Sequence, residues 1–229
     1  MRFVDQFRGL LFDMNGTFMF GHDRLDDTED FFSTYRGLGG TFLSEGEVNE
    51  SVRKICAGLR RDYDDPHCFE AFPSLLDATI KYGGISEDRA EEIANVIAAH
   101  EVGVVPSWAA HTLLTLSTTH PLALVSNVWA PAECWSGVLE GSGAAAAFRC
   151  QIFSSSFGAI KPSPLLFLAA LNALEVKASD ALFVGDSIER DIRPAKRLGM
   201  NTALIGSNTN CAEADITFLT IEQLLHCSD

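Results

Sequence analysis

Residues 8–17 read RGLLFDMNGT, and the interpretation of the whole chain starts from them. The apolar run at residues 10–12 has no polar alternation and stops at Asp13, which predicts a buried strand with a carboxylate at its end. Such strands are typical of a parallel sheet, which is covered on both faces. Four more short apolar runs end at polar or glycine residues: 122–125 at Ser126, 151–153 at Ser154, 181–184 at Gly185 and Asp186, and 202–205 at Gly206.

Helical patterns separate most of these apolar runs. Residues 163–174 and 188–198 carry apolar side chains at the three- and four-residue spacing of one helix face. An alternation of strands and helices indicates parallel strands joined by crossover helices. We therefore predict an α/β protein whose core is a doubly wound, Rossmann-like parallel sheet.

The alternation is interrupted between Asp13 and residue 122, where the signals are helical and no second buried strand is evident. Ser44 and Glu47 fit a capping box before an apolar helical pattern, and Gly83-Gly84 is a stop signal for a later helix. We expect a small helical cap domain at residues 22–103, inserted into a core domain made of residues 1–21 and 104–229.

Composition narrows the class of protein. The 229 residues are 47% hydrophobic, yet no apolar run approaches the roughly 20 residues that a membrane span needs. The charged N-terminus reaches Asp13 too early for a signal peptide, so we expect a cytoplasmic protein with no membrane partner. The net charge of −14 argues against nucleic acid as a partner, although a metal and a few cations could still hold a small phosphorylated substrate.

The cysteines and histidines give no metal signal. The six cysteines form no C-x-x-C pair and the six histidines form no H-x-x-x-H pair. We expect the cysteines to be reduced, mostly buried thiols.

Polar residues at the strand ends carry the chemistry. Ligands of open α/β sheets bind beyond the carboxyl ends of the strands, and Asp13, Ser126 and Asp186 all stand at such ends. Clustered carboxylates repel one another, and a bound Mg²⁺ relieves this because it takes oxygen ligands. A carboxylate beside the metal can then act as a covalent nucleophile on phosphorus, while Lys161 could hold both the nucleophile and the phosphate.

Four segments, in this order, resemble the motifs of the haloacid dehalogenase-like hydrolase superfamily. FDMNGT at residues 12–17 is similar to the first motif of its phosphatases, hydrophobic-D-x-D-G-T. VSN at 125–127 resembles the second motif and KP at 161–162 the third. VGDSIERDI at 184–192 resembles the fourth. The helical insert also matches the position of a superfamily cap that follows the first core strand.

The resemblance implies a role for each matching residue. Asp13 would be the nucleophile that forms an aspartyl-phosphate, and Lys161 would bind the transferring group. Asp191 would support the metal ligands or hold Lys161. The implied Mg²⁺ site contains Asp13, Asn15 through its backbone carbonyl, Asp186 and Asp191. The implied substrate-binding set is Gly16, Thr17, Ser126 and Asn127.

Asn15 departs from the phosphatase pattern. Phosphatases of the superfamily have a general acid/base aspartate two residues after the nucleophile. An amide keeps hydrogen-bonding geometry but neither gives nor takes a proton at neutral pH. Asn15 is therefore implied at the catalytic centre, but with the proton-transfer role in question.

Three functions remain open on the sequence. The first is Mg²⁺-dependent hydrolysis of a small phosphomonoester metabolite. The second is another superfamily hydrolase, of dehalogenase or phosphonatase type, although dehalogenases usually lack the aspartate found at position 186. The third is a catalytically weakened phosphate-binding or regulatory protein, suggested by Asn15. Substrate choice should come from the cap and flap, with these candidates: Phe18, Phe20, His22, Arg24, Tyr35, Arg36, Arg53, Lys54, Arg60 and Trp129.

Overall fold

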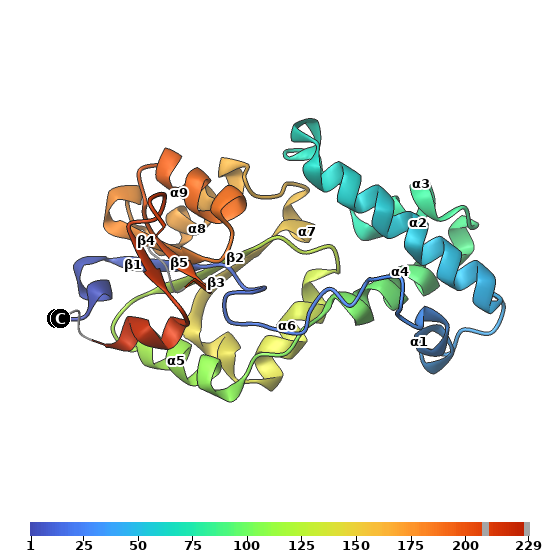
Figure 1. Cartoon of the computed structure of the whole chain (residues 1–229), viewed down its shortest axis with the longest axis horizontal. Helices are drawn as coiled ribbons and strands as arrows, with labels where there is room; N and C mark the ends of the chain where they lie inside the picture. The colour runs from blue at the N-terminus through green and yellow to red at the C-terminus, as the bar shows by residue number, and fades with distance from the viewer. Residues whose placement is uncertain (208–210, 227–229) are drawn as a thin grey trace.

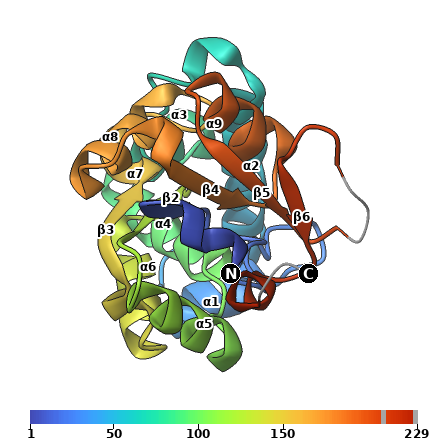
Figure 2. The ribbon, with the colours of Figure 1, turned by 90° about the vertical axis from the view of Figure 1, so that its left-hand side faces the viewer.

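A parallel sheet organises the computed structural model, which describes residues 1–207 and 211–226 and contains six strands within those ranges. The strands are β1 (Gly9–Phe12), β2 (Leu122–Ser126), β3 (Phe148–Phe153), β4 (Ala181–Gly185), β5 (Asn201–Ile205) and β6 (Ile216–Phe218). Their order is β3-β2-β1-β4-β5-β6 (Figure 2). The chain moves from β1 to one edge and returns on the other side of β1. This confirms the predicted doubly wound sheet and creates a switch point at the carboxyl ends of β1 and β4.

Different helices cover the two faces of the sheet, because side chains alternate along each strand. Leu10 and Phe12 of β1 belong to one apolar cluster with α5 (Ser107–Ser117) and α6 (Ala132–Gly141). Leu11 belongs to a second cluster with α8 (Pro164–Leu174) and α9 (Arg193–Arg197). Figure 2 shows the two helix pairs on opposite sides of the strands. Burial on both sides explains why these strands read as unbroken apolar runs.

Four helices follow β1 and pack against one another away from the sheet (Figure 1). They are α1 (Phe31–Gly37), α2 (Glu45–Asp64), α3 (Leu75–Gly83) and α4 (Glu87–Glu101). The predicted capping box is confirmed at the start of α2, where the Ser44 hydroxyl accepts from the Glu47 N–H and the Glu47 carboxylate accepts from the Ser44 N–H. Gly84 ends α3 as the sequence predicted. The insertion after β1 is therefore helical.

The two chain segments that connect these helices to the sheet lie side by side, and we call them the neck (residues 20–24 and 100–104). Phe20 and Val104 exchange two backbone hydrogen bonds of 3.0 and 2.8 Å. The N–H groups of Asp23 and Arg24 donate to the carbonyls of Glu101 and His100, each at 3.0 Å. The outgoing segment is thus fixed to the end of α4.

The structure departs from the predicted elements at two places. Strand β6 was not predicted, because three half-buried residues at a sheet edge make no apolar run. The helix predicted at 188–198 is a π-helical turn, Ile188–Ile192, followed by the short helix α9. Pro194 has no N–H to donate, so it suits the first turn of a new helix. Short helical segments elsewhere are α7 (Ser154–Phe157) and the 3₁₀ turns Phe3–Gln6, Pro66–Cys68, Ala144–Ala147, Ala178–Asp180 and Ile221–Leu225.

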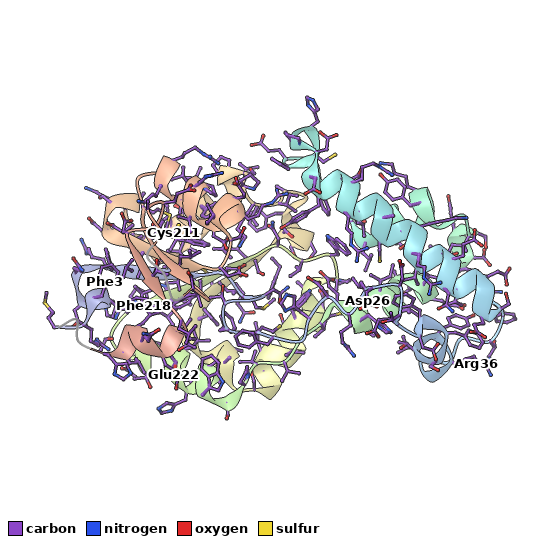
Figure 3. All side chains as sticks on the ribbon, viewed as in Figure 1. Phe3, Asp26, Arg36, Cys211, Phe218 and Glu222 are labelled. Carbon is purple, nitrogen blue, oxygen red and sulfur yellow. The ribbon has the colours of Figure 1, made fainter. Side chains whose placement is uncertain are left out.

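The molecule is long, with the sheet at one end and the inserted helices at the other. Figure 3 labels Phe3 and Phe218 at the sheet end, where their ring centroids lie 6.3 Å apart. It labels Arg36 at the far end of the helical region and Asp26 between these extremes. Within residues 1–207 and 211–226, five cysteines are free thiols as expected: Cys56, Cys68, Cys134, Cys150 and Cys211. The expectation that most are buried is wrong, because only Cys56 is buried and the other four are partly exposed. Cys227 lies outside these ranges. No helix in the described part of the chain is long and apolar enough to span a membrane.

Candidate active site

Asp13 stands at the end of β1, and a tight turn follows it. The Asp13 N–H donates to the Val184 carbonyl at 2.8 Å, so Asp13 is still held by the β1–β4 ladder. The Met14 carbonyl then accepts from the N–H groups of Thr17 and Phe18 at 3.2 and 3.0 Å. Gly16 has a φ of +79°, and a Cβ there would overlap the Asp186 carboxylate. Glycine at position 16 therefore permits both the left-handed backbone of the turn and the close approach of the Asp186 side chain.

Lys161 joins two of the predicted carboxylates. Its Nζ lies 2.6 Å from Asp13 Oδ1 and 2.6 Å from Asp191 Oδ1, and all three side chains are buried. Burial alone would lower the pKa of Lys161. The charges of Asp13 and Asp191 and their hydrogen bonds outweigh burial, so the pKa is raised above its usual value. Lys161 therefore stays protonated and holds one Asp13 oxygen in place.

The three aspartates form an acidic cluster. Oxygen atoms of Asp13, Asp186 and Asp191 all lie within 4.8 Å of one another. Burial raises the pKa of Asp186 to about 7, and the charges of Asp13 and Asp191 add to this, although Asp186 keeps contact with solvent at the cavity wall. Burial also raises the pKa of Asp191 to about 6, against the opposing charge of Lys161. Hard oxygen donors with excess negative charge fit a divalent cation.

The two predicted hydroxyl ligands differ in how they are bonded. The Thr17 hydroxyl donates to Asp13 Oδ2 at 3.1 Å and is fully buried. The Ser126 hydroxyl, at the end of β2, is also fully buried but has no hydrogen-bond partner among the described residues. An unpaired buried hydroxyl is costly, so it normally marks a position where a ligand or water bonds. Thr17 orients the carboxylate, whereas Ser126 is free to bind a ligand.

Asn127 positions Lys161 through its amide group. Its Oδ1 accepts from the Lys161 N–H at 2.7 Å, and its Nδ2 donates to the Lys161 carbonyl at 3.0 Å. Nδ2 also donates to the hydroxyl of Tyr63, at the end of α2, at 2.9 Å. Asn127 lines the cavity beside the cluster, but its polar atoms are already bonded within the protein. Direct substrate binding by Asn127 stays a prediction.

Arg190 links the sheet side of the site to the inserted helices. It comes from the π-helical turn after β4, and its guanidinium donates to the backbone carbonyls of Lys161 and Tyr63 at 3.0 and 2.6 Å. The guanidinium carbon also lies 4.1 Å from the Tyr63 ring centroid and 4.9 Å from that of Phe69. Sequence reasoning gave neither Arg190 nor Tyr63 a role. The arginine within GDSIERD was a visible signal, whereas its partner on α2 depends on tertiary contact.

Asn15 carries an amide side chain, which cannot transfer a proton at neutral pH. Its Oδ1 is buried and has no hydrogen-bond partner within the described residues. It lines the cavity of about 440 Å³ that contains Asp13, Lys161 and the acidic cluster. It also lines a neighbouring cavity of about 250 Å³ on the side of the helical insert. Asn15 therefore stands at the boundary between these two spaces.

The cavities contain only part of the predicted specificity set. His22 lines the larger cavity, and Arg60 and Trp129 line the smaller one. Phe18 is fully buried and stacks on Phe148, and Phe20 packs near Trp108. The remaining candidates bond elsewhere: Arg24 to Ala99, Tyr35 to Glu92, Arg36 to Gly40, Arg53 to Asp27 and Lys54 to Glu50.

Glu101 is a further site residue that the sequence did not reveal. It ends α4 and is only 3% exposed. Its two carboxylate oxygens accept from the N–H groups of Trp129 and Ala130, in the loop after β2, at 2.6 and 2.5 Å. Burial raises the pKa of Glu101 to about 8, although these two hydrogen bonds oppose the change. Glu101 thus ties the inserted helices to the loop that follows Ser126.

These features define an α/β protein with a candidate site for covalent catalysis at the carboxyl end of its sheet. A buried aspartate ends a central parallel strand, a lysine neutralises it, and two more carboxylates complete an acidic cluster. Such a carboxylate is suited to attack an electrophile that a cation helps to hold.

Comparison with known proteins specifies the class. Residues 159–220 match the model of the HAD-hydrolase-like family. A glyceraldehyde 3-phosphate phosphatase of Methanocaldococcus jannaschii is 27% identical over 219 residues, which cover 84% of this chain and 93% of that protein. The corresponding enzyme of Methanopyrus kandleri is 43% identical over 58 residues, only 25% of each chain.

Solved structures agree on the fold. A HAD phosphatase from Thermococcus onnurineus superposes with a TM-score of 0.62 at 24% identity, over 95% of both chains. A 2-haloacid dehalogenase from Pseudomonas syringae gives a TM-score of 0.64 at 21% identity, over 96% of both chains. The family match and the archaeal relatives support a protein of the haloacid dehalogenase-like hydrolase superfamily, of the phosphatase type.

Proposed function

We propose that this protein is a Mg²⁺-dependent phosphatase that hydrolyses a small phosphomonoester through an aspartyl-phosphate on Asp13. The observation that carries this proposal is the position of Lys161 Nζ, 2.6 Å from both Asp13 and Asp191. This ammonium group fixes the nucleophile and leaves Asp186 facing the same space. Phosphatase activity of the full-length archaeal relative supports the substrate class.

In this proposal the site forms between two domains. Residues 1–21 and 104–229 make the core domain, which supplies the nucleophile and the acidic cluster. Residues 22–103 make the cap domain, which closes over the substrate. Tyr63 and Arg60 on α2 line the smaller cavity, which would receive the part of the substrate that leaves as an alcohol.

The proposed metal site consists of Asp13, Asp186 and Asp191, with the Asn15 backbone carbonyl. The acidic cluster suits a divalent cation, because three carboxylates bring oxygen atoms within 4.8 Å of one another. A bound Mg²⁺ would offset the charge of the phosphate and orient the phosphoryl group.

The protein's own side chains then carry the transfer. Asp13 Oδ2 attacks phosphorus while Lys161 holds Oδ1. The unpaired Ser126 hydroxyl donates to a phosphoryl oxygen, which provides the hydrogen bond that it lacks in the protein. Lys161 also lies close enough to the cluster to balance charge that develops on the transferring group. Thr17 keeps the Asp13 carboxylate in its rotamer.

A phosphate-release assay on a metabolite panel tests this function. The panel should include glyceraldehyde 3-phosphate, the substrate named for the archaeal relatives, and an aryl phosphate. We expect Mg²⁺-dependent hydrolysis that excess EDTA abolishes. Rapid acid quench followed by peptide mass spectrometry should find a phosphate adduct on the peptide that contains Asp13.

Asp13→Asn is the matched variant, because it keeps the shape but removes the nucleophile. Full activity of that variant, or full activity in EDTA, would contradict the proposal. Phosphate binding without any turnover would instead favour the alternative of a catalytically weakened binding protein, for which Asn15 is the supporting feature. Release of halide from a 2-haloacid would favour the dehalogenase alternative.

A further inference from the structure

Asn15 leaves the proposed phosphatase without its usual proton donor, and the cavity walls contain a candidate replacement. Two cavities meet at the site: the larger holds the acidic cluster and the smaller extends beneath the cap helices. A leaving oxygen must lie where they meet, between phosphorus and the departing alcohol. The residues that line both cavities are Asn15, Asp23, Tyr63 and Asn127.

Of these four residues, Asp23 alone carries a group that can give and take a proton near neutral pH. Asn15 and Asn127 are amides, which do neither. Burial raises the pKa of the Tyr63 phenol above its usual value, and its hydroxyl already accepts a hydrogen bond from Asn127. The carboxylate of Asp23 makes no hydrogen bond within the described residues and is 57% exposed at the cavity wall. It is therefore available to a ligand.

The backbone holds Asp23 at this position. Its N–H donates to the Glu101 carbonyl at 3.0 Å, and its carbonyl accepts from the Leu25 N–H at 2.8 Å. Its φ of +54° is left-handed, a conformation that aspartate tolerates better than most residues. Across the neck, a Cβ at Gly103 would lie 2.7 Å from the Phe20 carbonyl oxygen and 3.1 Å from His22 Cβ, so glycine permits the close approach of this segment.

Charged neighbours set the protonation of Asp23. The groups that face it are His22, with Nε2 at 3.7 Å from Oδ2, Cys56 and Arg60 of α2, and Glu101 of α4. Partial burial raises the pKa of Asp23 above its ordinary value, although His22 and Arg60 oppose this. A raised pKa brings a carboxyl closer to the range in which general acids work at neutral pH.

We propose that Asp23 is the general acid/base of this protein, acting from the neck in place of the residue at position 15. The inference rests on the proposed phosphatase function. In the first step an Asp13 oxygen bonds to phosphorus, the bond from phosphorus to the leaving oxygen breaks, and the Asp23 proton passes to that oxygen to give the alcohol. In the second step water attacks phosphorus and gives its proton to the Asp23 carboxylate. The bond from phosphorus to Asp13 then breaks, which releases phosphate and restores both aspartates.

The test compares variants of the full chain on glyceraldehyde 3-phosphate, an alkyl ester, and p-nitrophenyl phosphate, an aryl ester. Asp23→Asn should lower kcat on the alkyl ester by roughly 10²–10⁴-fold, the usual contribution of a positioned acid or base. The burst phase with the aryl ester should change much less, because its leaving group needs no proton. The limb of the pH–rate profile that reports this acid/base should also disappear.

Two further variants make the result specific. Asp27→Asn is the matched control, because Asp27 is 95% exposed on the same segment and only pairs with Arg53 at 3.7 Å; its kcat should equal that of the wild type. Adding Asn15→Asp to Asp23→Asn should restore turnover, since it returns an acid/base to the same boundary.

The outcomes separate the two proposals. If the wild type is active and Asp23→Asn has the same kcat and the same pH profile, the role of Asp23 is overturned and the phosphatase function is left intact. Loss of activity that Asn15→Asp does not restore would also overturn it, because it would mark Asp23 as merely structural. No phosphate release by any variant, including those with Asp at position 15, would overturn the phosphatase function itself.

Discussion

Replacing Glu101 by glutamine should change how the stability of this protein depends on pH. The carboxyl is 3% exposed, and burial raises its pKa to about 8 from an ordinary 4.5. Because the pKa is higher in the folded state, the folded protein binds the extra proton between these values. Glu101 therefore stabilises the fold fully below pH 4.5, and this contribution is lost as the pH rises through about 8.

The size of the effect follows from the same values. One pH unit is worth roughly 1.36 kcal/mol, so the interval from 4.5 to about 8 corresponds to at most about 5 kcal/mol. The amide oxygen of glutamine accepts from only one of the Trp129 and Ala130 N–H groups. The other buried donor is left unpaired, which costs about 1–3 kcal/mol at every pH. Glu101→Gln should be less stable than the wild type at pH 5, and the difference should shrink or reverse by pH 9.

Urea denaturation of both proteins from pH 5 to pH 9, in EDTA, measures this difference. Asp186 and Asp191 titrate in both proteins, so their contributions cancel when the two curves are subtracted. Glu91→Gln is the matched control, because Glu91 is exposed on the same helix, and its difference from the wild type should be flat with pH. A constant difference between Glu101→Gln and the wild type would refute the reasoning, since it would mean that Glu101 does not change its protonation in the folded state.

Three further substitutions examine the site. Asp186→Asn should weaken Mg²⁺ binding by at least about tenfold in isothermal titration calorimetry, because it removes one anionic ligand of the acidic cluster; unchanged affinity would count against the metal site. Ser126→Ala should raise the inhibition constant of inorganic phosphate by roughly 3–10-fold, about one hydrogen bond, with little change in melting temperature, because its hydroxyl has no partner in the described protein. Arg190→Gln should speed amide hydrogen exchange in residues 63–72. The Arg190 guanidinium contacts the Tyr63 carbonyl and the Phe69 ring, which are two of the links between this segment and the sheet side. Exchange as slow as in the wild type would show that other contacts hold this segment.

The central strands could be predicted well from the sequence, because a strand that is buried on both faces consists of an unbroken run of apolar residues. β1 and β4 begin and end within one residue of the runs at 10–12 and 181–184. Edge strand β6 was missed for the opposite reason, since its residues are only half-buried and it has three of them. The π-helical turn before α9 was also missed, because apolar spacing at 188–198 is the same for a continuous helix and for one that restarts at Pro194.

Local motifs placed the acidic cluster, but long-range contacts lay beyond them. Asp13 and Asp186 lie close together, as their positions at strand ends suggested, and Lys161 and Asp191 join them from the segments that follow β3 and β4. The role of Glu101 could not be predicted, because in the sequence it is one of several charged residues on an amphipathic helix. Nothing near it in the sequence indicates that it contacts the loop after β2. Arg190 likewise shows no sign of its contact with Tyr63, 127 residues earlier in the chain.

The paired neck has a consequence for how such proteins can be rebuilt. Because Phe20 and Val104 are hydrogen-bonded neighbours, the whole helical insert enters and leaves the sheet layer at one point. The entropy of closing a loop depends on its ends, and only weakly on its length. We therefore expect that a helical insert of different size could be placed between residues 20 and 104 without displacing β1 or β2, if it keeps the contacts that Glu101 and Tyr63 make with the sheet side. If the insert selects the substrate, as we propose, that part of the protein could be exchanged as a unit, and under our inference Asp23 would have to be transferred with it.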